Sequence, residues 1–191
     1  MSTKVLVPSG VLGLGFSKKA LEKGLKRNPD IICIDGGSTD SGPFYLGTGT
    51  TKYSEEVCKK EWRILMQARE RLKIPLMIGS CGTCGTNSMV DWMFQITSQI
   101  AKDLGQNLKI IRVYCERKKD DLLNAFESNT IKPLNPILSV SNEEIETFSN
   151  IVALAGAEVF QKAISQKGDI ILVGRATDTA IISALPLLNE E

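Results

Sequence analysis

Short apolar runs alternate along the chain with longer segments in which apolar residues recur at helical spacing. Short runs rich in β-branched residues predict strands, and runs that are apolar throughout are typical of strands covered on both faces. Strands are predicted at residues 4–7, 31–35, 76–78, 110–115 and 170–173. Helices are predicted between them at residues 17–27, 54–73, 88–104 and 151–167, with shorter ones at 118–128 and 179–188.

Apolar stripes and end signals support the helix predictions. Two stripes are expected to face the sheet, formed by Cys58, Trp62, Leu65 and Leu72 on one helix and by Trp92, Ile96 and Ile100 on the next. The Ser-x-x-acid spacing of a helix start occurs twice, at Ser88 with Asp91 and at Ser141 with Glu144. Helices are expected to end at Gly105 and Gly168.

The alternation of strands and helices predicts the fold class. Short connections imply right-handed crossovers and a mainly parallel sheet flanked by helices on both faces, a Rossmann-like three-layer α/β sandwich. A chain of 191 residues, 42% of them hydrophobic, predicts a single α/β domain over residues 1–191. Residues 132–140, which contain two prolines, predict an irregular connection that acts as a hinge or lid boundary. Ligands of such sheets bind outside the carboxyl ends of the strands.

Charge and composition narrow the class of function. The formal net charge is +1 and basic blocks are absent, so we expect a small-molecule partner, not nucleic acid or an acidic membrane surface. The chain has no histidine, which removes the commonest general base, the commonest zinc ligand and every serine–histidine or cysteine–histidine dyad. Proton transfer must therefore use Asp, Glu, Lys, Tyr, Cys or water.

The sequence also predicts a compartment. The amino terminus lacks the pattern of a secretory signal, and no apolar run approaches the roughly 20 residues that span a bilayer. A cytoplasmic location is therefore expected. The five cysteines, Cys33, Cys58, Cys81, Cys84 and Cys115, are expected to be reduced thiols.

Glycine-containing turns follow the first three predicted strands. Gly10 and Gly13 precede a helix start that can receive an anion, although a purely structural tight turn explains them equally well. The next two turns carry more polar groups than a turn needs, which indicates a ligand-binding site. The structural alternative is that these side chains form hydrogen bonds that stabilise the loops themselves. Their candidate residues are Asp35, Gly37, Ser38, Thr39, Asp40, Ser80, Gly82 and Thr83.

Cys81 and Cys84 in the third turn have the spacing of a redox pair. A helix amino terminus lowers the pKa of a thiol, which would favour such chemistry. A thioredoxin-type site requires its own fold context, however, and zinc would need two further ligands. We therefore favour small residues in a tight, anion-receiving turn. An acidic pair such as Asp35 and Asp40 could hold magnesium against a substrate phosphate, but the sequence gives no ligand count, so no metal is assigned.

Charged residues follow the last two strands. Glu116 and Arg117 belong to a mixed charge run that is typical of a solvated loop, although both lie close enough to the strand to reach a cleft. Arg175 can hold a carboxylate or phosphate in a fork. Thr177 and Asp178 stand at a helix start, where Asp178 caps the helix or binds ligand. An ion pair between Arg175 and Asp178 is the structural alternative.

Three segments in this order resemble the acyclic terpene utilisation (AtuA-like) family. They are DGGSTDSGPFYLG at residues 35–47, PLMIGS at 75–80 together with the glycine-rich residues that follow it, and GRATD at 174–178. The resemblance implies a bacterial or archaeal catabolic enzyme of branched acyl or acyl-CoA breakdown. Family members are longer, so it also implies that this chain is an amino-terminal portion. The chain departs from the family at Cys81 and Cys84, where small non-thiol residues are usual.

The leading functional hypothesis is a lyase or hydratase domain that acts on a carboxylate, acyl-thioester or phosphate-bearing metabolite. Asp35 or Asp40 would be the acid/base, Arg175 would pair with the anion, and hydroxyls such as Ser38 would polarise the substrate. The alternatives are a noncatalytic module for a nucleotide, coenzyme A or another anion, and a cysteine redox protein. The sequence leaves the cofactor open, and also whether the chain pairs with a second copy or with a missing carboxyl-terminal portion.

Overall fold

The computed structural model describes residues 2–38, 41–132, 134 and 140–189. In these residues five strands form one sheet in which every pairing is parallel, in the order β1-β2-β3-β5-β4. The strands are β1 (Val5–Leu6), β2 (Ile31–Asp35), β3 (Leu76–Gly79), β4 (Ile110–Val113) and β5 (Ile170–Val173). The predicted strands are thus found, with ends that differ by at most two residues.

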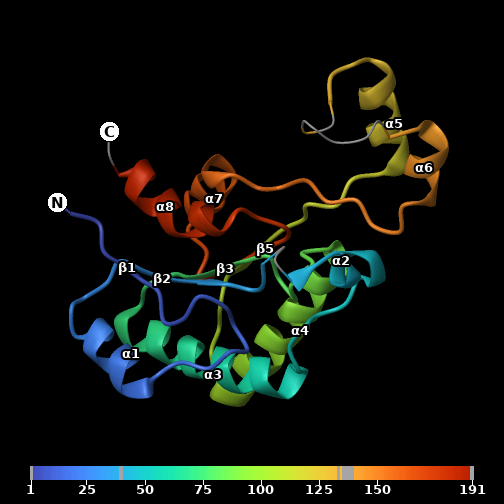
Figure 1. The fold of residues 1–191 in the computed structure, drawn as a ribbon. Coiled ribbons are helices and arrows are strands. Elements are labelled where there is room, and N and C mark those ends of the chain that lie inside the picture. Colours follow the sequence, from blue (N-terminus) through green and yellow to red (C-terminus); the bar gives the residue numbers. More distant parts are fainter. Residues whose placement is uncertain (1, 39–40, 133, 135–139, 190–191) are drawn as a thin grey trace.

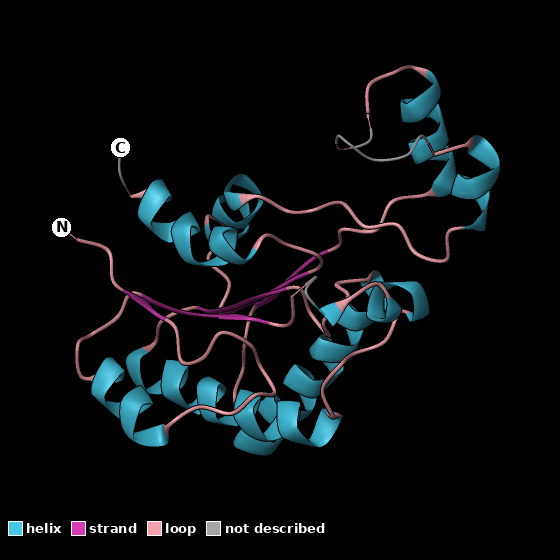
Figure 2. Cartoon of the chain, in the orientation of Figure 1, coloured by secondary structure: helices cyan, strands magenta, loops and turns pink. Residues whose placement is uncertain are grey.

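Helices cover both faces of this sheet, which confirms the three-layer α/β class (Figures 1 and 2). The face shown below the sheet in Figure 1 carries α1 (Lys18–Leu25), α3 (Glu55–Leu72) and α4 (Asn87–Leu104). The opposite face carries α7 (Ala157–Ile164) and α8 (Asp178–Leu188). The remaining helices are α2 (Phe44–Thr48), α5 (Lys119–Glu127) and α6 (Asn142–Thr147).

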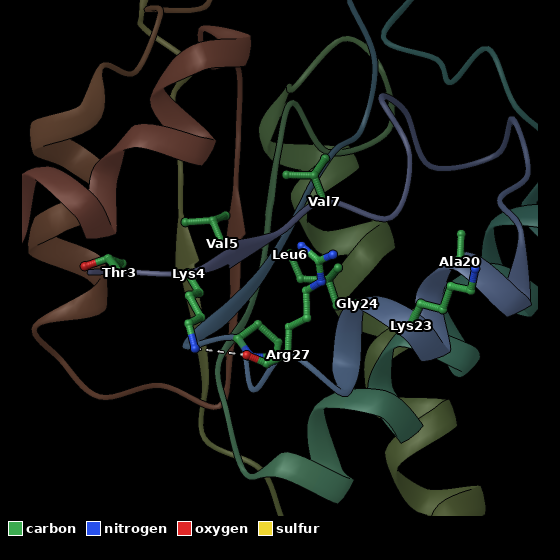
Figure 3. Close-up of a pocket in the computed structure, with 10 residues that line it drawn as sticks. Thr3, Lys4, Val5, Leu6, Val7, Ala20, Lys23, Gly24 and Arg27 are labelled. Carbon is green, nitrogen blue, oxygen red and sulfur yellow. Dashed lines mark hydrogen bonds between the residues drawn. The ribbon is translucent and has the colours of Figure 1, made fainter. Parts of the chain in front are cut away.

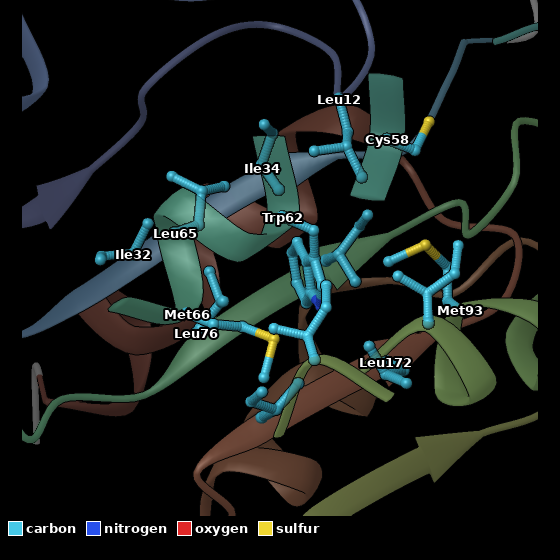
Figure 4. Packing of buried hydrophobic residues seen from close by; sticks show 14 of the residues in the cluster. Leu12, Ile32, Ile34, Cys58, Trp62, Leu65, Met66, Leu76, Met93 and Leu172 are labelled. Atoms are coloured by element: carbon cyan, nitrogen blue, oxygen red, sulfur yellow. The ribbon is translucent and has the colours of Figure 1, made fainter. Parts of the chain in front are cut away.

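Two apolar layers hold the helices to the sheet. Successive strand residues point to opposite faces, so Ile32 and Ile34 enter the layer under α3, while Ile31 enters the layer under α7 and α8. Trp62 of α3 is completely buried in the layer that contains Ile32 and Ile34 (Figure 4). Its indole Nε1 donates to Thr97 Oγ1 at 2.9 Å, so the polar end of the ring has a partner inside the core.

The two edges of the sheet differ. On β4, the Arg112 guanidinium lies 4.3 Å from the centre of the Phe94 ring and pairs with Asp91. On β1, which pairs only with β2 among the described strands, an open groove runs between the strand and α1 (Figure 3).

Helices α5 and α6 lie away from the sheet, at the end of an arm (Figure 1). The segment that leaves the sheet toward α5 and the segment that returns from α6 are joined by an antiparallel bridge between Glu116 and Val152. The Asn150 side chain donates to the Leu46 carbonyl at 2.7 Å and so joins the arm to α2. The predicted irregular connection at 132–140 falls largely outside the described residues.

The capping predictions had mixed outcomes. Ser141 and Glu144 form the predicted capping box, and Gly105 ends α4 with a φ of 64°. The prediction at Ser88 and Asp91 was wrong, because α4 begins at Asn87 after Thr86. Asp91 Oδ1 instead accepts bonds from two side chains at the edge of the sheet, Arg112 and Tyr114.

The predicted helix at 151–167 was too long. Residues 151–156 are not helical; they contain isolated bridges at Val152 and Ala155, and the Ala153 and Ala155 amides donate to the carbonyls of Cys115 and Arg175. The predicted stop at Gly168 was also wrong, since α7 already ends at Ile164. A Cβ at Gly168 would lie 2.6 Å from Ile111 Cδ1, so the glycine permits close packing.

Candidate functional site

The turns after β2, β3 and β5 are joined by backbone hydrogen bonds. The Gly36 amide donates to the Gly79 carbonyl at 2.8 Å, and the Ser80 amide donates to the Gly174 carbonyl at 2.8 Å. Because the strands are parallel and adjacent, all three turns emerge at the same edge of the sheet. Three distant motifs of the sequence therefore meet in one place.

Arg175 lies at the centre of this arrangement. Its Nη1 donates to the carbonyls of Gly37 at 3.1 Å and Thr83 at 2.8 Å, so it bridges the other two turns. The residue is only 5% exposed, and its buried Nε has no hydrogen-bond partner among the described residues. A buried donor without a partner is costly, so this Nε is an unsatisfied hydrogen-bonding group inside the site.

A cavity of about 200 Å³ opens beside Arg175. It is lined by Ser38, Gly42, Pro43, Tyr45, Leu46, Thr83, Cys84 and Arg175. Of the predicted residues, the cavity brings together Ser38, Thr83 and Arg175. The apolar walls from Tyr45 and Leu46 belong to α2, a helix that was not predicted from the sequence.

Asp35 ends β2 and is 6% exposed. Neither carboxylate oxygen makes a hydrogen bond within ordinary geometric limits to any described residue. Burial, reinforced by the charge of Asp178, raises the pKa of Asp35 to about 6, although the Gly37 and Gly36 amides and Arg175 act in the opposite direction. A carboxyl group that titrates near neutral pH can both donate and accept a proton.

The turn between β3 and α4 has an unusual backbone. Ser80 and Thr83 have φ values of 50° and 70°, in the left-handed region that non-glycine residues rarely adopt. Thr83 is held there by its amide, which donates to the carbonyls of Gly36 and Ser80. Such strain is concentrated at functional sites, where the surrounding structure enforces it.

The first glycine-rich turn lies against α3, and neither of its candidate residues lines the cavity. The Gly13 amide donates to Glu61 Oε2 at 2.7 Å, and a Cβ on Gly13 would lie 2.6 Å from Tyr53. Gly10 is exposed, and a Cβ there would have nothing within 4 Å. These contacts favour the structural interpretation of this turn.

Two residues of the third turn have internal partners. The Ser80 hydroxyl is fully buried and donates to the Ala176 carbonyl at 3.3 Å, so it joins the β3 turn to the β5 turn. Gly82 has a φ of 60°, and a Cβ there would meet Met89 Sδ at 2.6 Å. Both residues shape the site without lining the cavity.

The start of α8 supplies a charge at this edge. The helix begins at Asp178, and its N-cap is Thr177, whose side chain makes no capping bond. Asp178 therefore does not cap the helix, and no ion pair joins it to Arg175 in the described part of the chain.

Thr39 and Asp40 lie outside the described residues.

Two glutamates act in ways that were not predicted from the sequence. Glu61 is 7% exposed, and its carboxylate accepts the Gly13 amide and so holds that turn. The one feature of the sequence that could have revealed this role is an acidic residue next to Trp62 on the apolar face of the predicted helix. Glu116 Oε2 accepts from the Asn87 amide at the start of α4 at 2.5 Å. Arg117 is exposed.

All five cysteines are buried free thiols. Burial raises the pKa of Cys81, which disfavours the thiolate that redox chemistry requires. Cys84 reaches the cavity wall, with its Sγ 3.4 Å from Thr86 Oγ1.

Within the described residues, no group of three or more Cys, Asp or Glu side chains has the arrangement of a metal site. In the same part of the chain, no helix is both long enough and apolar enough to cross a membrane.

Comparison with protein-family models, curated proteins and solved structures gives no match to this chain. The geometry of the site and the motifs that form it are therefore the basis for a functional assignment.

Proposed function

We propose that this chain is an enzyme domain that binds a small anionic metabolite at the carboxyl edge of its sheet. The observation that carries the proposal is the buried Arg175, whose Nε lacks a described partner beside a cavity that Ser38 and Thr83 also line. A carboxylate or phosphate oxygen on the ligand would bind the part of the Arg175 guanidinium that borders the cavity.

The cavity fits one part of a ligand better than a whole coenzyme. Its volume of about 200 Å³ is below the roughly 300 to 1,000 Å³ of typical small-molecule pockets. A short organic acid, or the acyl or phosphate end of a longer molecule, is the expected occupant. The aromatic ring of Tyr45 and the side chain of Leu46 would contact a carbon chain, while the guanidinium of Arg175 would bind the anion.

Asp35, which ends β2 where the turn of the site begins but does not itself line the cavity, is the proposed acid/base. Its buried carboxyl group has no described hydrogen-bond partner, and its raised pKa of about 6 suits proton transfer near neutral pH. A lyase or hydratase reaction needs such a group, because a proton leaves or joins carbon as water or another group is eliminated or added. Asp178 contributes by its charge, which raises the pKa of Asp35.

The motifs that resemble the AtuA-like family are the ones that carry these residues, which supports a catabolic acyl or acyl-CoA substrate. The same cavity would also serve a noncatalytic anion-binding module. Turnover distinguishes the two, since a binding module would be stabilised by its ligand without converting it.

A thermal-shift screen of short carboxylic acids, acyl-CoAs and nucleotides tests the proposal. A ligand at a hundred times its Kd stabilises a protein by about 2.7 kcal/mol, which is roughly 5 to 10 °C for a domain of this size. Arg175→Lys is expected to abolish most of this shift, because lysine retains the charge but not the fork of donors.

Arg117→Ala is the matched control, since Arg117 is exposed at the same end of the sheet and does not line the cavity. Asp35→Asn is expected to bind the same ligand without converting it. If no anion stabilises the wild-type chain, or if Arg175→Lys responds like wild type, the proposed site is wrong.

A further inference from the structure

The groove beside β1 is separate from the proposed site. It has a volume of about 1050 Å³ and lies along residues 3–7, with Ala20, Lys23, Gly24 and Arg27 of the α1 region as its other wall (Figure 3). Val7, at its end, is 38% exposed.

The floor of the groove is the edge of a sheet. β1 pairs with β2 on one side, and among the described residues no strand pairs with it on the other. An edge strand presents backbone donors and acceptors that can pair with an added strand, about 4.8 Å away. The groove therefore offers main-chain hydrogen bonds to an extended peptide.

The walls of the groove are positively charged. Lys4, Lys23 and Arg27 are exposed and line it, whereas no acidic residue among those described does. None of the three forms an ion pair with a described carboxylate. The nearby acid Asp30 uses its carboxylate to accept the Lys4 backbone amide at 2.7 Å.

These charges decide between possible occupants. A second copy of the chain, paired edge to edge, would bring the same cations of both copies together, and like charges oppose such pairing. A peptide with acidic side chains would place its carboxylates against Lys23 and Arg27 while its backbone pairs with β1. On the opposite edge strand, β4, the charge of Arg112 is by contrast already paired with Asp91.

We propose that β1 and its basic groove bind an extended acidic segment of a partner protein, which adds to the sheet as a sixth strand. Main-chain hydrogen bonds would supply affinity, and the cations would select for acidic side chains, as in other cases of strand addition.

The probe for this proposal is a capped, fluorescent eight-residue peptide that alternates valine and glutamate, measured by fluorescence anisotropy with the full chain. We expect saturable binding, at least tenfold weaker binding of the matching valine–lysine peptide, and slower amide hydrogen exchange within residues 5–7 in the complex. The double variant Lys23→Glu with Arg27→Glu is expected to weaken binding at least about fivefold, because attraction becomes repulsion.

Lys18→Glu with Lys19→Glu is the matched control, since both lysines are on α1 but do not line the groove. A valine–glutamate peptide that is N-methylated at alternate amides retains its charge but cannot complete a ladder, and it is expected to lose binding. Three results would overturn the proposal: equal binding of the methylated peptide, no binding of the parent peptide, or a dimer in sedimentation that the Lys23/Arg27 reversal dissociates.

Discussion

The carboxylate of Asp178, at the first turn of α8, acts on the carboxyl group of Asp35, at the end of β2. The two residues are far apart in the sequence, but the sheet brings their segments to the same edge, where the charge of Asp178 adds to burial in raising the pKa of Asp35. As a result, the Asp35 carboxyl group retains its proton to about pH 6, and this makes the stability of the fold depend on pH.

The first prediction concerns stability against pH. In the unfolded chain Asp35 would titrate near its ordinary value of 3.8, but in the folded chain it titrates near 6, so the folded state binds its proton more tightly between these values. This contribution to stability is fully present below about pH 4 and is lost as the pH rises past about 6. One pKa unit corresponds to about 1.4 kcal/mol, so the loss is about 3 kcal/mol.

Urea unfolding of wild type and Asp35→Asn between pH 4 and 8 measures this loss. The variant lacks the titrating group, so its stability relative to wild type should rise by about 3 kcal/mol across that range. Asp120→Asn, at an exposed position on α5, should follow the wild-type profile. Parallel profiles for Asp35→Asn and wild type would show that Asp35 is not a perturbed carboxyl group.

The second prediction concerns the contact between Gly85 and Arg175. Gly85 has a φ of 68°, and a Cβ there would lie 2.3 Å from the Arg175 backbone nitrogen. Gly85→Ala is therefore expected to destabilise the fold by roughly 2 to 4 kcal/mol and to displace Arg175 from the cavity wall. Urea unfolding and the ligand-induced thermal shift report these two effects.

Gly10→Ala is the control for Gly85→Ala. A Cβ at Gly10 would have nothing within 4 Å, so this variant is expected to stay within about 0.5 kcal/mol of wild type and to bind ligand normally. Equal stability of the two variants would contradict the close approach of the β3 and β5 turns.

The third prediction concerns Glu61, which anchors the first glycine-rich turn. Glu61→Ala removes the acceptor of the partly buried Gly13 amide and is expected to destabilise the chain by about 1 to 3 kcal/mol. Glu61→Gln retains an acceptor oxygen and should lose less. Hydrogen exchange at Gly13 should accelerate in the alanine variant; unchanged exchange there would rule out the anchoring role.

The fourth prediction concerns the thiols. All five cysteines are buried, and burial raises the pKa of Cys33 and Cys81, and that of Cys58 to about 11. A disulfide reagent such as 5,5′-dithiobis(2-nitrobenzoate) should therefore react slowly with the native chain and rapidly after unfolding in guanidinium. Rapid reaction of two native thiols, with formation of a Cys81–Cys84 bridge, would instead support the redox hypothesis.

Helices and strands followed from the sequence wherever local pattern and packing agree. The strands at residues 31–35 and 170–173 were predicted with their observed ends, because each is buried on both faces and is an apolar run, which in the first strand is closed by Asp35. The non-helical segment at 151–156 was predicted as helix, because its apolar residues have no pattern that reveals pairing with Cys115 and Arg175. The local sequence pattern carries no information about a hydrogen-bond partner that is distant in the chain.

By itself the sequence determined the α/β class and the edge at which Asp35, Ser80 and Arg175 meet, because the polarity of parallel strands sends every strand-following turn to the same side. Only the tertiary structure decided which residues of those turns face a cavity. The Gly13 amide donates to Glu61 and the Ser80 hydroxyl donates to the Ala176 carbonyl, so both are used within the fold. Arg175, in contrast, has a buried Nε without a described partner. The physical reason is that a side chain's role depends on which distant groups satisfy its hydrogen bonds, and those groups are brought within reach only when the layers pack.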